Sequence, residues 1–254
     1  MPIAITKQVS DSIGLCELEY LERSPIDREK AICQHRTYEL CLNQCGLRVI
    51  SLPGDPKFPD GLFVEDPAIV LDEIAIICRM GAAPRRGENA SIAEALSPFR
   101  QLEWIREPAT IEGGDVLRLG KTLFCGVSRR TNREGAQQLA DALCPLGYTV
   151  VPVIVSGCLH LKSAICPLRD GAMIANRSWI ETKPFEGFRI LDVAETEPLA
   201  ANVLAIREKI IMPASFPKTR KILEAAGLEV IALDISELQK AEAGVTCSSL
   251  IFDA

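Results

Sequence analysis

The sequence repeats one local pattern, a glycine followed by a run rich in β-branched residues, and this repeat limits the folds that the chain can adopt. The pattern occurs at Gly46, Gly147 and Gly227, which precede Leu-Arg-Val-Ile, Tyr-Thr-Val-Val and Leu-Glu-Val-Ile. Glycine commonly ends a helix, whereas β-branched residues favour strands. Strand-turn-helix patterns begin near residues 74, 122 and 209, at spacings of roughly one and two times 45 residues. The repeat predicts an α/β fold, with its units either around an axis or in an ordinary sheet.

Capping residues and hydrophobic periodicity predict where the elements begin and end. We expect one helix to have Ser24 as its N-cap and to end at Cys45. A second helix should be capped by Thr131 and Glu134 and should reach Leu143. Strands are expected at residues 3–5, 47–52, 74–79, 122–126 and 209–212, and helices from about residue 88 and after residue 217. No linker rich in proline, glycine or serine divides the chain, so residues 1–254 are expected to form one domain.

The composition excludes several classes of protein. Of the 254 residues, 48% are hydrophobic and 24% are charged, as expected for a globular chain. The net charge of −6 argues against a nucleic-acid-binding protein, which needs a basic surface. No run of about 18 apolar residues predicts a membrane span, and the N-terminus lacks the apolar core of a secretory signal. We therefore expect a cytoplasmic protein that interacts with neither nucleic acid nor membrane.

Ten cysteines are present, and no two of them form a Cys-X-X-Cys pair. This spacing matches neither a zinc ribbon nor a thioredoxin motif. In a reducing compartment, most of the cysteines are expected to be small buried hydrophobic residues. The alternative is that some of them form a metal or redox site.

The segment 58–67 places the carboxylates of Asp60, Glu65 and Asp66 among apolar residues and between prolines. If the segment from Leu62 is a strand, Glu65 and Asp66 point to opposite faces, so at least one of them is directed towards a buried side. A buried carboxylate needs a cation or hydrogen-bond donors. Either an arginine or lysine of the protein or a cationic ligand would meet this need.

Cys247 and His160 are the candidates for nucleophilic catalysis. Cys247 follows a turn that contains Gly244 and precedes a terminal strand, while His160 alternates with leucines as a strand residue would. The other histidine, His35, lies mid-helix and is expected to be structural. A thiol with a histidine in reach matches the general pattern of cysteine nucleophiles, although each residue alone is more often structural. A bound cation or a protonated histidine would lower the pKa of the thiol.

Two further patterns carry charge in turns. Glu112 and Asp115 bracket two glycines, which allow the backbone to approach a ligand closely. The pairs Arg85-Arg86 and Arg129-Arg130 lie between an expected strand and helix, where binding residues concentrate. Arginine binds carboxylates through two parallel hydrogen bonds. In isolation, each of these patterns is also typical of a solvated turn.

In this order, the segments resemble the dimethylarginine dimethylaminohydrolases, a family of guanidine-modifying enzymes related to arginine deiminases and amidinotransferases. The resemblance covers nearly the whole chain. It rests on six motifs, which are Phe58-Pro59-Asp60 through Glu65-Asp66-Pro67, Gly81 through Glu88, Glu112 through Asp115, Ser128 through Asn132, Leu159 through Lys162, and Gly244 through Leu250. It implies a propeller (pentein) of five α/β modules around a pseudo-fivefold axis, which agrees with the repeat.

The resemblance also implies a function and a role for each candidate residue. The substrate would be a methylated arginine, hydrolysed to citrulline and dimethylamine without a cofactor or metal ion. Cys247 would be the nucleophile and His160 the general acid and base. Glu112 and Asp66 would hold the guanidinium nitrogens of the substrate. Arg85 and Arg130 would bind its carboxylate, and Asp60 its α-amino group. Glu65 would support His160 or its network, and the loop near Ile13 would close over the substrate. A homodimer is compatible with the resemblance.

Three alternative functions remain open at this point. An arginine deiminase would use the same set of residues, although this chain has no room for the helical insertion of those enzymes. An amidinotransferase would also share the residues but would exclude water until its acceptor binds. A non-catalytic arginine-binding protein could keep the scaffold without turnover.

Overall fold

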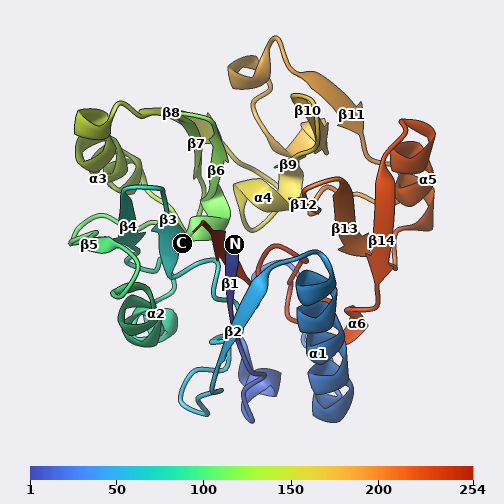
Figure 1. Cartoon of the computed structure of the whole chain (residues 1–254), viewed down its shortest axis with the longest axis horizontal. Helices are drawn as coiled ribbons and strands as arrows, with labels where there is room; N and C mark the ends of the chain where they lie inside the picture. The colour runs from blue at the N-terminus through green and yellow to red at the C-terminus, as the bar shows by residue number, and fades with distance from the viewer. Residues whose placement is uncertain (254) are drawn as a thin grey trace.

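The computed structural model describes residues 1–253, which form five small sheets of three strands each. Figure 1 shows the sheets around a common centre, where both ends of the chain lie. In strand order, the sheets are β15 (Leu250–Phe252), β1 (Ile3–Lys7) and β2 (Arg48–Leu52); β3 (Ala68–Val70), β4 (Ile74–Ile77) and β5 (Gln101–Trp104); β6 (Val116–Leu119), β7 (Thr122–Val127) and β8 (Thr149–Ile154); β9 (Ile165–Pro167), β10 (Ala172–Ala175) and β11 (Arg189–Asp192); β12 (Leu204–Ile206), β13 (Lys209–Pro213) and β14 (Glu229–Leu233). The expected five α/β modules around an axis are therefore confirmed.

In each sheet the middle strand pairs antiparallel with one neighbour and parallel with the other. Parallel strands need a crossover, and in four modules it contains a helix. These helices are α1 (Arg28–Gln44), α2 (Asn89–Leu96), α3 (Arg133–Leu143) and α5 (Pro217–Ala225). The crossover between β10 and β11 has only two single 3-10 turns, Arg177–Trp179 and Lys183–Phe185. Two short helices, α4 (Leu161–Ala164) and α6 (Ser236–Gln239), lie outside these crossovers.

Strand β1 shows how the modules pack. All five of its residues are buried, because the strand has neighbours on both edges and apolar side chains over both faces. Ile3 and Ile5 pack in a hydrophobic cluster with Leu96 of α2, whereas Ala4 packs in a second cluster with Tyr38 of α1. Burying each isoleucine contributes about 1.5–3 kcal/mol to stability. The N-terminal strand is thereby fixed at the centre of the five sheets.

The strand that pairs antiparallel with the middle strand faces the centre in every module. Residues of β3, β6, β9, β12 and β15 all line one central cavity of about 350 Å³. Glu65, Lys162 and Thr246 line it as well. These three residues are sequence neighbours of Asp66, His160 and Cys247, so the turns that carry the predicted site residues adjoin the central axis.

Two helix caps differ from those expected. Asp27, not Ser24, caps α1, because its carboxylate accepts a hydrogen bond from a first-turn backbone N–H at 3.0 Å. Asn132, not Thr131, caps α3 in the same way, at 2.8 Å. The Thr131 hydroxyl instead accepts a hydrogen bond from the backbone N–H of Glu112 at 3.1 Å. A side chain that could cap a helix here ties the β7–β8 crossover to the turn that precedes β6.

Two expected strands are turns or helix in the structure. The segment from Leu62 to Pro67 forms turns, and His160 directly precedes α4. Because the backbone turns, Glu65 and Asp66 are both buried rather than directed to opposite faces. The sequence correctly predicted that at least one carboxylate is buried, but a turn and not a strand buries it.

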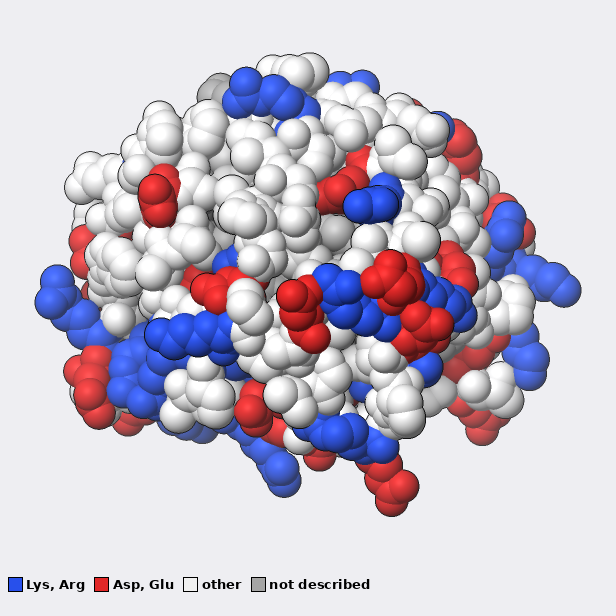
Figure 2. Space-filling model, turned by 90° about the horizontal axis from the view of Figure 1, so that it is seen from below, with Lys and Arg blue, Asp and Glu red and all other residues white. Residues whose placement is uncertain are grey.

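None of the helices within residues 1–253 has the length and apolar character needed to cross a membrane. On the face drawn in Figure 2, acidic and basic side chains are interspersed. This mixture agrees with the modest net charge of −6.

Candidate active site

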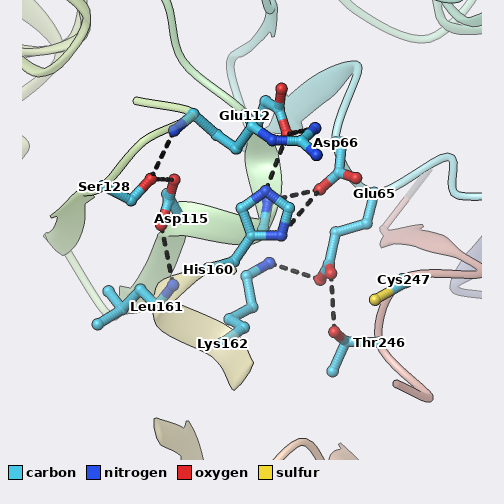
Figure 3. Close-up of polar contacts among 12 residues, drawn as sticks. Glu65, Asp66, Glu112, Asp115, Ser128, His160, Leu161, Lys162, Thr246 and Cys247 are labelled. Atoms are coloured by element: carbon cyan, nitrogen blue, oxygen red, sulfur yellow. Dashed lines mark hydrogen bonds and ion pairs between the residues drawn. The ribbon is translucent and has the colours of Figure 1, made fainter. Parts of the chain in front are cut away.

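A small cavity of about 20 Å³ brings six of the predicted residues together on its wall. They are Asp60, Asp66, Arg85, Arg130, His160 and Cys247. Figure 3 shows the sulfur of Cys247 directed towards the group that contains Asp66 and His160. Because turns from several modules meet at the axis, residues far apart in the sequence share this cavity. It is the candidate active site.

The turn that carries Cys247 is fixed by hydrogen bonds on both sides. The backbone N–H of Gly244 donates to the Cys247 sulfur at 3.3 Å, and the Cys247 carbonyl accepts from the N–H of Glu65 at 3.1 Å. The Asn202 side chain accepts from the N–H of Thr246 at 3.1 Å and donates to its hydroxyl at 3.0 Å. Gly244 packs directly on Asn202, so no side chain fits at this position. The sulfur is therefore held in one place.

The thiol of Cys247 is protonated in the site as it stands. Burial raises the pKa of Cys247, and the negative charges of Glu65 and Asp66 raise it further. The Gly244 N–H and Lys162 offset this effect only in part. A cation placed beside the sulfur would stabilise the thiolate, so the site suits a positively charged ligand.

His160 lies at the centre of a charged network (Figure 3). Its Nε2 is 2.8 Å from Glu112 Oε2, and its Nδ1 is 3.9 Å from Asp66 Oδ1. Burial alone would lower the pKa of His160, but Asp66, the Glu112 hydrogen bond and Asp115 outweigh it and raise the pKa to about 9. Gly114 leaves room for the ring, because a Cβ there would lie 2.8 Å from Nδ1. His160 is thus an imidazolium at neutral pH.

Glu112 lies behind His160 and not on the cavity wall. Its side chain is fully buried, and one oxygen accepts a hydrogen bond from the Gly81 N–H at 2.9 Å while the other contacts His160. Burial would raise the pKa of Glu112, but His160, Arg85 and Arg130 hold it well below its usual range. In this structure Glu112 holds His160, and its expected contact with a guanidinium ligand stays a prediction.

Arg85 is clamped between two buried carboxylates. Its Nη1 donates to Asp66 Oδ2 at 2.9 Å, and its Nη2 and Nε donate to Glu88 at 2.9 and 3.1 Å. Burial raises the pKa of Glu88 to about 7 despite the opposing effect of Arg85. A guanidinium has five N–H donors, so donors remain for a further carboxylate.

Arg130 is paired with a carboxylate of the N-terminal segment. Its Nε donates to Glu19 Oε1 at 2.5 Å, and its Nη1 lies 3.5 Å from Glu112 Oε2. The carboxylate of Glu242 holds the same segment by accepting hydrogen bonds from the N–H groups of residues 19, 20 and 21. Both arginines predicted to bind a substrate carboxylate are therefore already in ion pairs.

The N-terminal segment meets the cavity at a different residue from the one expected. Ile13 is 1% exposed and packs in a hydrophobic cluster, so it does not line the cavity. Glu17 does line it, and its backbone N–H donates to Asp60 Oδ2 at 3.0 Å. Burial raises the pKa of Asp60, with Arg85 acting in the opposite direction. The apolar character of Ile13 explains its position in the core.

Glu65 contacts neither His160 nor the wall of the active-site cavity. One of its oxygens accepts a hydrogen bond from Lys162 Nζ at 2.6 Å, and the other accepts from the Thr246 hydroxyl at 2.7 Å. Through Thr246 and its own backbone N–H, Glu65 supports the turn that carries Cys247. Within the expected supporting role, Glu65 therefore holds the turn of Cys247 and does not contact His160.

Asp66, Glu112 and His160 have ligating atoms within 4.8 Å of one another, a spacing that could hold a metal ion. However, Arg85 contacts the Asp66 carboxylate and Arg130 contacts the Glu112 carboxylate. Two guanidinium groups beside the same oxygens would repel a metal cation. The arrangement is better explained as an ion-pair network around His160.

Comparison with known proteins identifies the family. A family model described as N,N dimethylarginine dimethylhydrolase, eukaryotic, matches residues 17–250. Proteins named N(G),N(G)-dimethylarginine dimethylaminohydrolase from Pseudomonas aeruginosa and Streptomyces coelicolor are each 38% identical to this chain. The alignments cover 89% and 97% of this chain and 90% and 95% of the two relatives. The chain belongs to the dimethylarginine dimethylaminohydrolase family.

Solved structures of dimethylarginine dimethylaminohydrolases share this fold. The Pseudomonas aeruginosa protein, as a cysteine-to-serine variant complexed with citrulline, superposes with a TM-score of 0.93 at 35% identity and 98% coverage of both chains. A dimethylarginine dimethylaminohydrolase variant forming an adduct with S-methyl-L-thiocitrulline superposes with a TM-score of 0.94 at the same identity and coverage.

Three residues of this dimethylarginine dimethylaminohydrolase family member were not predicted as parts of the site. Glu88 follows Arg85 by three residues, a spacing at which side chains on a helical turn can meet, so a local signal existed. Glu19 reaches Arg130 across 111 positions, and Asn202 reaches Thr246 across 44. No local pattern predicts such pairs.

Proposed function

We propose that this protein hydrolyses the guanidinium C–N bond of N-ω-methylated arginine, releasing citrulline and methylamine or dimethylamine. The observation that carries the proposal is the placement of Cys247, His160 and Asp66 on the wall of one cavity, with Glu112 behind His160. Family membership supports the same activity. In this proposal residues 1–254 act as one catalytic unit without a cofactor.

Acidic and basic side chains on the cavity wall divide the recognition of the substrate between them. Asp66 offers a carboxylate beside Cys247, where a flat cation with several N–H donors can bind. Arg130 and Arg85 bind the α-carboxylate of the substrate, and Asp60 binds its α-amino group. For Arg130 to do so, the substrate carboxylate must take the place of Glu19. The buried position of both arginines strengthens these charged hydrogen bonds.

Binding of the substrate cation also activates the nucleophile. The guanidinium charge offsets the negative charges of Glu65 and Asp66, which lowers the pKa of Cys247 and lets its proton leave to solvent. The thiolate then attacks the guanidinium carbon, forming a C–S bond and a tetrahedral intermediate. His160, charged below about pH 9, gives its proton to the departing amine nitrogen as the C–N bond breaks. A covalent thiouronium on Cys247 and a neutral His160 remain.

During hydrolysis of the intermediate, His160 changes from proton donor to proton acceptor. Neutral His160 takes a proton from water, and the resulting hydroxide attacks the same carbon. The C–S bond breaks, and the hydroxyl proton of the intermediate passes to the departing Cys247 sulfur, which restores the thiol and forms citrulline. Glu112 stabilises the imidazolium that appears in this step, because its buried carboxylate lies 2.8 Å from the ring.

A product screen tests the proposed function. The purified protein should release citrulline and dimethylamine from N-ω,N-ω-dimethylarginine faster than it releases ammonia from arginine. Arginine, monomethylarginine, hydroxyarginine and agmatine complete the set. Preferential ammonia release from arginine would indicate a deiminase, and transfer of an amidino group would indicate an amidinotransferase. Binding without any turnover would indicate an arginine-binding protein.

A Glu19→Gln variant should bind dimethylarginine more tightly than the wild type. Removing the charge frees Arg130 for the substrate carboxylate, so KM should fall by about three- to tenfold. A substrate without an α-carboxylate, such as agmatine or a methylated analogue, should not gain. Steady-state kinetics with the two substrates measure the difference.

Glu22→Gln is the matched control, because Glu22 is an exposed glutamate of the same segment. It should leave KM for both substrates unchanged. Equal effects of Glu19→Gln on substrates with and without the carboxylate would show that Arg130 does not bind that group.

A further inference from the structure

Asp115 is a fully buried carboxylate that the proposed reaction does not use. It lies in the single 3-10 turn Gly113–Asp115, does not line the cavity, and is 0% exposed. Among the ion pairs of residues 1–253 there is none within 4.0 Å that involves Asp115. A buried carboxylate without a cationic partner is costly, so its contacts should reveal what the position contributes.

One oxygen of Asp115 holds the backbone next to His160. Oδ1 accepts a hydrogen bond from the N–H of Leu161 at 2.9 Å (Figure 3). Leu161 is the first residue of α4, and its N–H is one that a helix cannot satisfy internally. Gly126 of β7 keeps this contact open, because a Cβ there would lie 2.6 Å from Oδ1. Asp115 thereby fixes the main chain from which the His160 ring projects.

The other oxygen of Asp115 holds the turn that carries Arg130. Oδ2 accepts a hydrogen bond from the Ser128 hydroxyl at 2.7 Å. The same hydroxyl oxygen accepts from the N–H groups of Arg130 at 3.0 Å and Thr131 at 3.2 Å. Ser128 therefore organises this turn, and Asp115 orients the Ser128 hydroxyl so that both backbone donors can be accepted.

We propose that Asp115 is a positioning residue that couples the acid/base His160 to the carboxylate-binding Arg130, through Leu161 on one side and Ser128 on the other. The proposal rests on the roles given to His160 and Arg130 in the proposed function. Asp115 then fixes the backbone of both residues, while Glu112 Oε2 contacts both of their side chains. Such a link matters because small displacements of catalytic groups reduce rates strongly.

The negative charge of Asp115 also acts on His160 electrostatically. Burial raises the pKa of Asp115 to about 6, while His160 and the hydrogen bonds of Ser128, Thr131 and Leu161 act against that rise. Asp115 is consequently ionised at neutral pH and is one of the groups that raise the pKa of His160. The charged or titratable groups around the pair are Asp66, Glu112, Arg85, Arg130, Cys125 and Cys158.

Two variants separate the two contacts. Asp115→Asn keeps the size of the side chain and removes its charge, so the pKa of His160 should fall and kcat should drop by about tenfold or more. Ser128→Ala keeps the charge of Asp115 and removes the hydroxyl that organises the Arg130 turn. It should raise KM for dimethylarginine by about tenfold while leaving the pKa of His160 unchanged.

NMR titration of the histidine ring measures the first effect independently of activity. The sequence has only two histidines, so a His160→Ala spectrum assigns the signals. Kinetics of both variants measure the second effect, and urea unfolding midpoints check that they are folded.

The proposal is overturned if Asp115→Asn leaves the pKa of His160 unchanged, or if Ser128→Ala leaves KM unchanged. If Asp115→Asn does not fold, Ser128→Ala decides, because breaking the link between Asp115 and the Arg130 turn should raise KM without shifting the pKa of His160. Failure of the proposed function is a separate outcome: the wild type itself would not release dimethylamine, whereas the NMR titration would still report on Asp115.

Discussion

A Cys247→Ser variant should bind methylated arginine but turn it over at least about 10³-fold more slowly than the wild type. The hydroxyl would occupy the place of the sulfur on the cavity wall, so recognition by Asp66, Arg85 and Arg130 should persist. A serine hydroxyl does not ionise beside the substrate cation as a thiol does. Isothermal titration calorimetry measures binding, and a citrulline assay measures turnover.

Cys158→Ser is the matched control for this prediction. Cys158 is the cysteine whose thiol donates to the His160 carbonyl, at 3.4 Å, so it is close to the site but does not face the ring. Burial raises its pKa to about 12, and Cys158 does not line the active-site cavity, so a substrate cation bound there would not activate it as it would Cys247. Full activity of Cys247→Ser together with loss of activity in Cys158→Ser would reverse the assignment.

A His160→Ala variant should lose about 10²- to 10⁴-fold in kcat with dimethylarginine. Without the imidazolium, no group in contact with the reacting atoms can give a proton to the departing amine. The loss should be much smaller for an analogue whose leaving group is a thiol, because a thiolate departs without prior protonation. Comparing the two substrates measures the acid role of His160 directly.

The pH dependence of the wild type follows from the same group. The pKa of His160 is raised to about 9, so the protonated form is present below that pH and is lost above it. Activity should therefore fall as the pH rises through about 9. A rate that is equally low for both leaving groups in His160→Ala, or a wild-type rate insensitive to pH in that range, would contradict the role of His160.

The repeated units could be predicted from the sequence because each has its own local signals. Gly46 and Gly227 lie just after α1 and α5, Gly147 follows the 3-10 turn after α3, and a strand follows each glycine, as the pattern required. The module of β10 was missed, since its crossover has two single turns in place of a helix and offers no helical period to detect. Its middle strand, Ala172–Ala175, fills the gap between the units at 122 and 209.

The site was predicted as a set of residues, and the structure shows which of them share a cavity. The sequence could not show that Asp66 lines the cavity while Glu112 lies behind His160, because both carboxylates lie in short turns beside glycines or prolines. It also could not show that Arg130 is paired with Glu19, a contact that exists only once the modules close around the axis. Ile13 was assigned from the family resemblance, and its burial in a hydrophobic cluster is visible only in the structure.

The most direct test of the account is to quench the wild type with acid during turnover of dimethylarginine and to map modified peptides by mass spectrometry. The account predicts an adduct with the mass of the substrate less dimethylamine, on the peptide that contains Cys247. Turnover that leaves all ten cysteines unmodified, or an adduct on any of the other nine, would contradict it.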